Sequence, residues 1–143
     1  DEKPGKREQL KKALEANDAE QVRKISDDVV YLINDGMDFA KAAIDKIQRA
    51  QDMNVNADYK EYLRLKESAL SKQVEAFEQY RQAARALRDN YDPKNDQLRA
   101  KVKTEFEERS DKYRELMEKA RDYSSEANEL AKDALRKQAQ GNK

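Results

Sequence analysis

Hydrophobic residues recur along this chain at alternating spacings of three and four positions, which is the period of one face of an α-helix. The pattern runs through three long stretches, about 19–51, 58–91 and 93–138. Within the second stretch it repeats every seven residues, at Leu63, Leu70, Phe77, Ala84 and Tyr91. A seven-residue repeat is typical of helices that pack side by side. The sequence therefore predicts three long helices with coiled-coil-like packing.

The segments between these stretches predict where the helices begin. Asp92 fits a helix N-cap, and Pro93 fits the first helical position because no backbone N–H needs a partner there. Segment 52–58 contains two Asn and two Asp and lacks a helical stripe, so we expect a loop in which Asp58 caps the next helix. Both connections are short, and short connections force neighbouring helices to run antiparallel.

A weaker break occurs at Asn17-Asp18, where Asp18 can cap a new helix. It predicts a short helix at about 6–16, ahead of the long helix at 19–51. The alternative is one unbroken helix over about 6–51. We favour the break because Asp18 followed by Gln21 has the form of a helix N-cap.

The predicted fold class is all-α: an elongated antiparallel three-helix bundle with coiled-coil-like packing and a short extra N-terminal helix. The three Gly and two Pro of the 143 residues are too few for the turns of a sheet-rich protein. In this interpretation 6–138 form a single helical-bundle domain. Residues 1–5 are then a polar N-terminal tether, and 139–143 are a polar tail.

The short connection at Asp92-Pro93 also predicts a register. If two helices turn there, facing residues have numbers that sum to about 185, given the constant rise per residue. Large residues then face large ones, in the pairs Tyr80 with Phe106, Leu70 with Leu116, and Leu63 with Tyr123. Phe77 falls beside Arg109, whose guanidinium would stack on the ring or extend to water.

The same register leaves the C-terminal end of the third helix beyond the start of the second. The overhang of about ten residues follows from placing residue 57 opposite about residue 128. Its apolar stripe is Leu130, Ala131, Ala134 and Leu135. We predict that this stripe contacts a partner protein or a second copy of the chain. The alternative is a local cap on the bundle end, formed with Met53 and Val55.

Gly36 lies on the apolar side of the first long helix, where Gly costs about 1 kcal/mol relative to Ala. We interpret it as a site of close packing against a bulky ring, with Phe77 as the candidate. On that interpretation Gly36→Ala would lose stability. A functional kink is the alternative.

The composition excludes several classes of chemistry. The chain has no Cys and no His, and therefore lacks the common nucleophile, general base and metal ligands. The carboxylate pairs Asp27-Asp28 and Glu107-Glu108 lie on polar faces among Lys and Arg, which indicates solvated charge. We expect no enzymatic activity, no cofactor and no metal site.

Charge and hydropathy also limit the partners. Thirty basic residues balance thirty acidic ones, so we expect no nucleic-acid binding. No apolar run approaches the roughly 20 residues that span a bilayer, so we expect no membrane insertion. The chain begins with Asp1 rather than Met, so either an N-terminal segment was removed naturally or the sequence is a trimmed piece of a longer one. A polar tether before a helical body would suit a processed exported protein. A soluble protein of the bacterial periplasm or cell envelope, such as an anchored lipoprotein, is therefore our location hypothesis.

The leading functional hypothesis is a non-enzymatic structural or protein-interaction bundle. The alternative is a small-molecule or peptide binder with a pocket where small residues thin the packing, at Gly36, Ala40, Ala69 and Ala76. The predicted bundle is similar to spectrin-like repeats, adaptor domains and bacterial envelope proteins in architecture only. Spectrin-like repeats usually carry a core Trp, and this chain has none.

Overall fold

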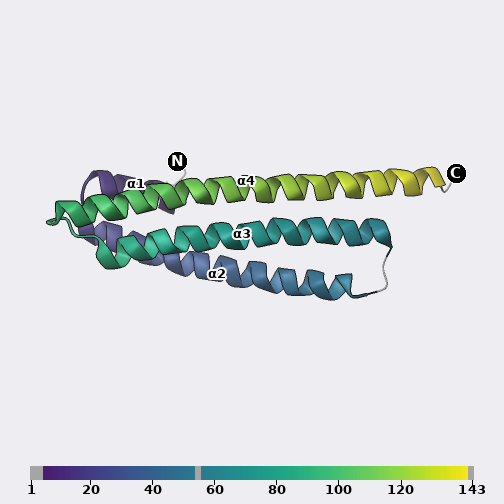
Figure 1. Ribbon diagram of the computed structural model, residues 1–143, viewed down its shortest axis with the longest axis horizontal. Helices are drawn as coiled ribbons and strands as arrows, with labels where there is room; N and C mark the ends of the chain where they lie inside the picture. The colour runs from purple at the N-terminus through teal and green to yellow at the C-terminus, as the bar shows by residue number, and fades with distance from the viewer. Residues whose placement is uncertain (1–4, 54–55, 142–143) are drawn as a thin grey trace. The chain divides into compact units, whose positions relative to one another are not determined.

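The described part of the chain is helical throughout, apart from its connections. A computed structural model describes residues 5–53 and 56–141 and contains four helices and no strand in that part (Figure 1). The helices are α1 (Lys6–Glu15), α2 (Ala19–Gln51), α3 (Ala57–Asn90) and α4 (Asp96–Gly141). The all-α class is therefore confirmed, and the short extra helix makes the total in this part four rather than three.

The ends of the chain differ from the predicted boundaries. Residues 139–141 belong to α4, so the helix continues into the segment that we expected to be a polar tail. Gly5 is the N-cap of α1. Residues 1–4 of the predicted tether and residues 142–143 of the predicted tail lie outside the described residues.

The break before α2 is confirmed at Asn17. Its φ of 52° lies in the left-handed region, which Asn tolerates better than most residues and which ends α1. Asp18 then caps α2, because its Oδ1 accepts a hydrogen bond from the Gln21 N–H at 3.3 Å. The Tyr91 hydroxyl donates to Asn17 Oδ1 at 2.5 Å. This bond ties the α1–α2 turn to the end of α3.

The cap of α3 is Asn56, and the prediction of Asp58 was wrong. The Tyr59 N–H donates to Asn56 Oδ1 at 2.8 Å. The Lys60 N–H bonds to the Asn56 carbonyl at 3.0 Å, which places Asn56 at the boundary and Asp58 inside the first turn. Asp58 there still complements the positive end of the helix.

The cap of α4 is Asn95, and the prediction of Asp92 and Pro93 at the helix start was wrong. The Leu98 N–H donates to Asn95 Oδ1 at 3.1 Å. Asp92 instead starts a turn, in which its carbonyl accepts from the Asn95 N–H at 3.3 Å. Asp followed by Pro suits the first two positions of such a turn as well as it suits a helix start. The turn delays α4 by three residues.

Contacts divide the chain into two units, which we describe separately. The first unit comprises Asp1–Gly36 and Phe77–Tyr113, and the second comprises Met37–Ala76 and Arg114–Lys143. The first unit therefore holds α1 and segments of the other three helices. The second unit holds segments of α2, α3 and α4. The single domain over 6–138 stays a prediction.

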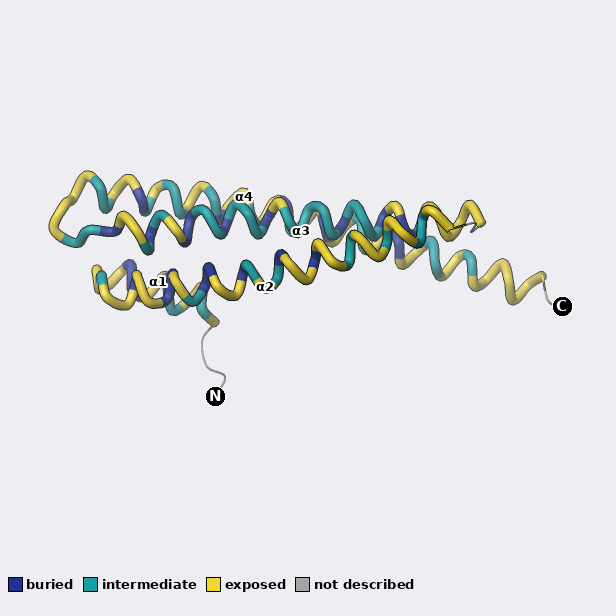
Figure 2. Tube along the Cα trace, turned by 90° about the horizontal axis from the view of Figure 1, so that it is seen from below, coloured by how far each residue is buried: buried dark blue, intermediate teal, exposed yellow. Residues whose placement is uncertain are grey.

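In the first unit α3 packs against α2 on one side and α4 on the other. Arg81 of α3 donates to Asn34 Oδ1 of α2 at 3.0 Å. The ring of Tyr80 lies 5.8 Å from that of Phe106 on α4, which confirms the predicted pair. The fully buried side chains of this unit include Leu10, Val22, Leu87 and Tyr91. Figure 2 shows buried positions on α1, α2, α3 and α4.

Arg109 was expected either to stack on Phe77 or to extend to water. Its Nη1 donates to Gln79 Oε1 at 2.9 Å and its Nε to Glu105 at 3.0 Å. The guanidinium therefore bonds to two polar side chains of the first unit, with 29% of the Arg109 side chain exposed, an arrangement that neither alternative described. Phe77 instead packs near Tyr113, with ring centroids 6.4 Å apart.

In the second unit α3 again contacts both neighbours. Its Glu67 accepts hydrogen bonds from Gln48 and Gln51 of α2, each at 3.0 Å. Lys66 donates to Asn128 Oδ1 of α4 at 3.4 Å. The core of this unit includes Leu63, Leu65, Ala69, Ala76, Leu116, Ala120 and Ala127. The predicted pairs Leu70–Leu116 and Leu63–Tyr123 stay predictions.

Two large apolar side chains of α2 lie outside its buried face. The hydrophobic pattern would place Leu32 and Phe39 on or beside the packed face of α2, yet Leu32 is 54% exposed and Phe39 is 81% exposed. Phe39 lies about 200° around the helix from the buried Met37, since successive residues turn by about 100°. Hydrophobic character alone therefore did not place these two side chains.

The predicted contact of Gly36 with Phe77 is confirmed, but its steric consequence changes. A Cβ built on Gly36 would lie 3.5 Å from Phe77 Cε2, which is ordinary van der Waals contact. Ala therefore fits at this position without displacing the ring. The loss of stability expected from the sequence for Gly36→Ala does not follow from this geometry.

We now expect Gly36→Ala to raise the free energy of unfolding by about 0.5–1 kcal/mol, because Gly disfavours a helix interior by about that amount. Urea unfolding followed by circular dichroism measures the change. Gly141→Ala at the end of α4 is the control, because neither position has a clash and only Gly36 lies mid-helix. Destabilisation by Gly36→Ala would show that Phe77 cannot accept the methyl group.

Candidate functional site

The four residues of the predicted interface lie together near the C-terminal end of α4. Leu130, Ala131 and Ala134 are half-buried, and Leu135 is 66% exposed. All four line one groove of about 690 Å³ on the second unit, which we call the apolar groove. The structure thus brings the predicted residues into one concave surface, while their contact with a partner stays a prediction.

The opposite wall of the apolar groove comes from the start of α3. Tyr59 and Tyr62 line it, and their rings stack with centroids 6.1 Å apart and planes inclined by 15°. The Asn56 cap starts α3 early enough to place both rings in its first two turns. The ammonium of Lys66 lies 5.7 Å from the Tyr62 ring centroid, so a cation–π contact supports this wall.

The predicted absence of α3 beside the stripe was therefore wrong, although the end of α4 does run past the start of α3, as predicted (Figure 1). Tyr59 and Tyr62 of α3 accompany Leu130 and Leu135 of α4 along the groove. The predicted sum of facing residue numbers, about 185, was too low for this end of the bundle. One reason is that α4 begins at Asp96, after the turn, rather than at Pro93. The stripe on α4 is consequently one side of a groove between two helices.

Of the two loop residues offered as a local cap, only Met53 belongs to the described part of the chain. Met53 is 65% exposed and is not among the residues that line it. Val55 lies outside the described residues. Among the residues that the structure describes, Leu135 therefore keeps most of its surface open to solvent.

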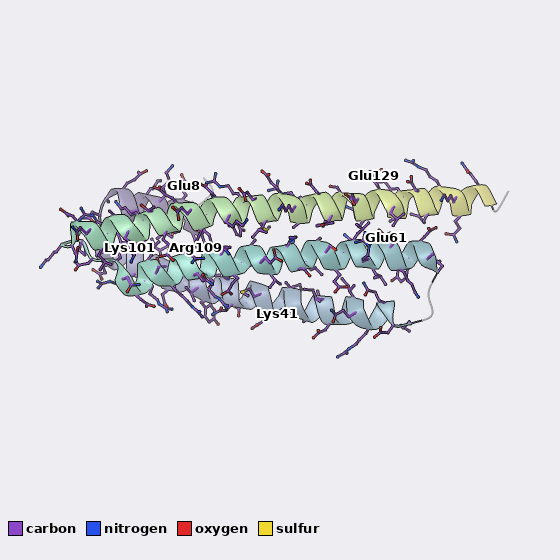
Figure 3. All side chains as sticks on the ribbon, viewed as in Figure 1. Glu8, Lys41, Glu61, Lys101, Arg109 and Glu129 are labelled. Carbon is purple, nitrogen blue, oxygen red and sulfur yellow. The ribbon has the colours of Figure 1, made fainter. Side chains whose placement is uncertain are left out.

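A second groove of about 480 Å³ lies on the other side of Leu130, and we call it the acidic groove. Its floor includes the buried Leu65 of α3. Its carboxylates come from both helices and are Glu61, Glu126, Glu129 and Asp133. Figure 3 shows Glu61 and Glu129 on these neighbouring helices of the second unit.

Three of these carboxylates pair with bases on their own helix. Arg64 bonds to Glu61 at 2.6 Å, and this hydrogen bond holds the pKa of Glu61 below its usual range. Lys132 and Arg136 pair with Glu129 and Asp133 at 3.4 and 3.5 Å. Exposed pairs of this kind are weak and are screened by salt, so the carboxylates can accept another cation.

The carboxylate pairs singled out in the sequence occupy partly exposed surface of the first unit. Asp27 pairs with Arg88 and Asp28 with Lys6, each at 3.2 Å. Glu107 and Glu108 are exposed. Within 5–53 and 56–141 no three acidic side chains are grouped so that they could hold a metal ion.

Tyr80 is a buried titratable residue and therefore a candidate catalytic group. Its hydroxyl has no hydrogen-bond partner within the described part of the chain, and burial raises its pKa. Burial disfavours the charged phenolate, which is the form that could act as a base. The ring packs 5.3 Å from Tyr113, so we assign Tyr80 to the core of the first unit.

No protein-family model, curated protein or solved structure significantly matches the chain. In the part of the chain that the structure describes, no helix has the length and apolar character to cross a bilayer. Function must therefore be inferred from the chain's own residues.

Proposed function

We propose that this chain is a non-enzymatic protein-interaction module that binds its partner in the apolar groove. The observation that carries the proposal is Leu135, a large apolar side chain that is 66% exposed beside two stacked tyrosines in a concave surface. Tyr is enriched at binding hot spots, and exposed apolar surface rimmed by polar residues commonly marks an interaction site. Leu130 and the two small alanines give the partner a surface that it can approach closely.

The alternative function, a ligand pocket where small residues thin the packing, has weaker support. The ring of Phe77 fills the space beside Gly36 in the first unit. In the second unit Ala40, Ala69 and Ala76 are buried. These observations favour close helix packing at the small residues rather than a ligand there.

The proposal is tested with three helical peptides of fourteen residues that share leucines at i, i+3, i+4 and i+7 spacing. One carries Lys at the remaining positions, one Glu and one Gln. We expect at least one peptide to bind, or the chain to self-associate, and Leu135→Asp to abolish either event. Fluorescence anisotropy and light scattering are the measurements.

Phe39→Asp is the matched control, because Phe39 is another exposed large side chain that does not line the apolar groove. It should leave both binding and solution mass unchanged. If neither a peptide nor a second copy binds through Leu135, the apolar groove is not an interaction surface and the proposal fails.

A further inference from the structure

The charged residues that line the two grooves are all acidic, and the bases that pair with three of them, Arg64, Lys132 and Arg136, lie outside the linings. The apolar groove is lined by one carboxylate and the acidic groove by four, and neither lining includes Lys or Arg. The carboxylates are Asp58, Glu61, Glu126, Glu129 and Asp133. Because Leu130 lines both grooves, a partner that covers it meets apolar side chains flanked by acids.

From this arrangement, and resting on the proposed function, we propose that the occupant is a basic amphipathic helix of another protein. Its apolar face would contact Leu130, Leu135 and the tyrosines. Its Lys or Arg side chains would reach the carboxylates on either side. Charge complementarity of this kind steers association and suppresses wrong partners.

The form of the groove favours a helix as the occupant. Its walls are two neighbouring helices, with Leu130 and Ala134 at i, i+4 spacing on α4 and Tyr59 and Tyr62 at i, i+3 spacing on α3. Ridges at these spacings accept the ridges of a further helix. Amphipathic helices commonly bind in apolar grooves through such anchors.

The first unit shows that this chain already uses the same kind of element. Besides segments of α2, α3 and α4, this unit contains α1, a helix of ten residues that buries Leu10, Ala13 and Leu14. The bases of α1 are Lys6, Arg7, Lys11 and Lys12, and its acids are Glu8 and Glu15. Lys6 pairs with Asp28 of α2 at 3.2 Å. In the described part of the second unit only three helical segments are present, and no element corresponds to α1.

A second copy of the chain fits the surface less well. In a twofold dimer the same patch lies on both sides of the interface. Two such patches would place the carboxylates of one copy against those of the other, and like charges across an interface are unfavourable. A basic partner avoids this repulsion.

The peptide panel distinguishes these occupants. We expect the Lys peptide to bind at least about tenfold more tightly than the Glu peptide, and its affinity to fall as salt is raised. The double variant Glu126→Lys with Asp133→Lys should weaken binding of the Lys peptide by about tenfold. Glu118→Lys with Asp122→Lys is the control, since these exposed acids of α4 line neither groove and give the same charge change.

Three results would overturn the inference. If the Glu or Gln peptide binds as tightly as the Lys peptide through Leu135, the partner is not basic, although the interaction function stands. If the two double variants weaken binding equally, net charge rather than the groove acids sets affinity. If the chain forms a dimer that Leu135→Asp dissociates, the occupant is a second copy. Unchanged circular dichroism of each variant shows that the fold is retained.

Discussion

Truncating Leu87 to alanine should lower the free energy of unfolding by about 2–5 kcal/mol, one of the largest effects expected of a single substitution in this chain. Leu87 of α3 is fully buried in the first unit, where Val22 and Tyr91 are also buried. Truncation removes apolar surface from the core and leaves a cavity. Urea unfolding followed by circular dichroism measures the loss.

The loss of stability should fall in the upper part of that range because neighbouring side chains cannot move to fill the cavity that truncation leaves. Ala83 and Ala84 on the preceding turn of α3 are fully buried and have no further side-chain atoms that could move into a cavity. Leu32→Ala is the matched control, since Leu32 is 54% exposed in the same unit and should cost less than about 1 kcal/mol. Equal losses for the two variants would contradict the assigned core.

The helices could be predicted because hydrophobic residues recur along them at regular spacing. The sequence did not determine which residue is the N-cap of each helix. Each loop offers several short polar side chains, and propensity does not choose between Asn56 and Asp58, or between Asp92 and Asn95. The hydrogen bonds decide these cases, and they depend on where the preceding turn leaves the chain. The break at Asn17 was predictable because Asn17-Asp18 combines a left-handed former with a cap.

The candidate site could be predicted on α4 but not on α3. Leu130 and Leu135 form an apolar stripe that is visible in the sequence. Tyr59 lies immediately after the residues taken as a loop, and Tyr62 lies beside Leu63, the first residue of the seven-residue repeat. Their position opposite α4 depends on register, and an error of one or two turns decides whether they face the stripe. The two tyrosines near the start of α3, Tyr59 and Tyr62, were the feature of the sequence that could have indicated this second wall.

Replacing Leu10 with alanine should detach and unfold α1 while α2, α3 and α4 keep their helices. A helix of ten residues is too short to be stable alone in water, so α1 depends on the packing of its buried side chains. Leu10 is the largest of these and is fully buried. Losing its contacts removes about 2–5 kcal/mol, which exceeds any gain from the better helix propensity of alanine.

Hydrogen exchange followed by mass spectrometry resolves this effect, because residues 6–15 should lose protection while the fully buried Val22 and Leu87 regions keep theirs. Lys11→Ala is the control: Lys11 is exposed in the same helix and also becomes alanine, yet it should retain protection. Since alanine favours a helix at both positions, unfolding only in Leu10→Ala would show that packing holds α1. Unchanged protection in Leu10→Ala would mean that α1 does not depend on this contact, and would remove α1 as the internal precedent for a helix bound in the apolar groove.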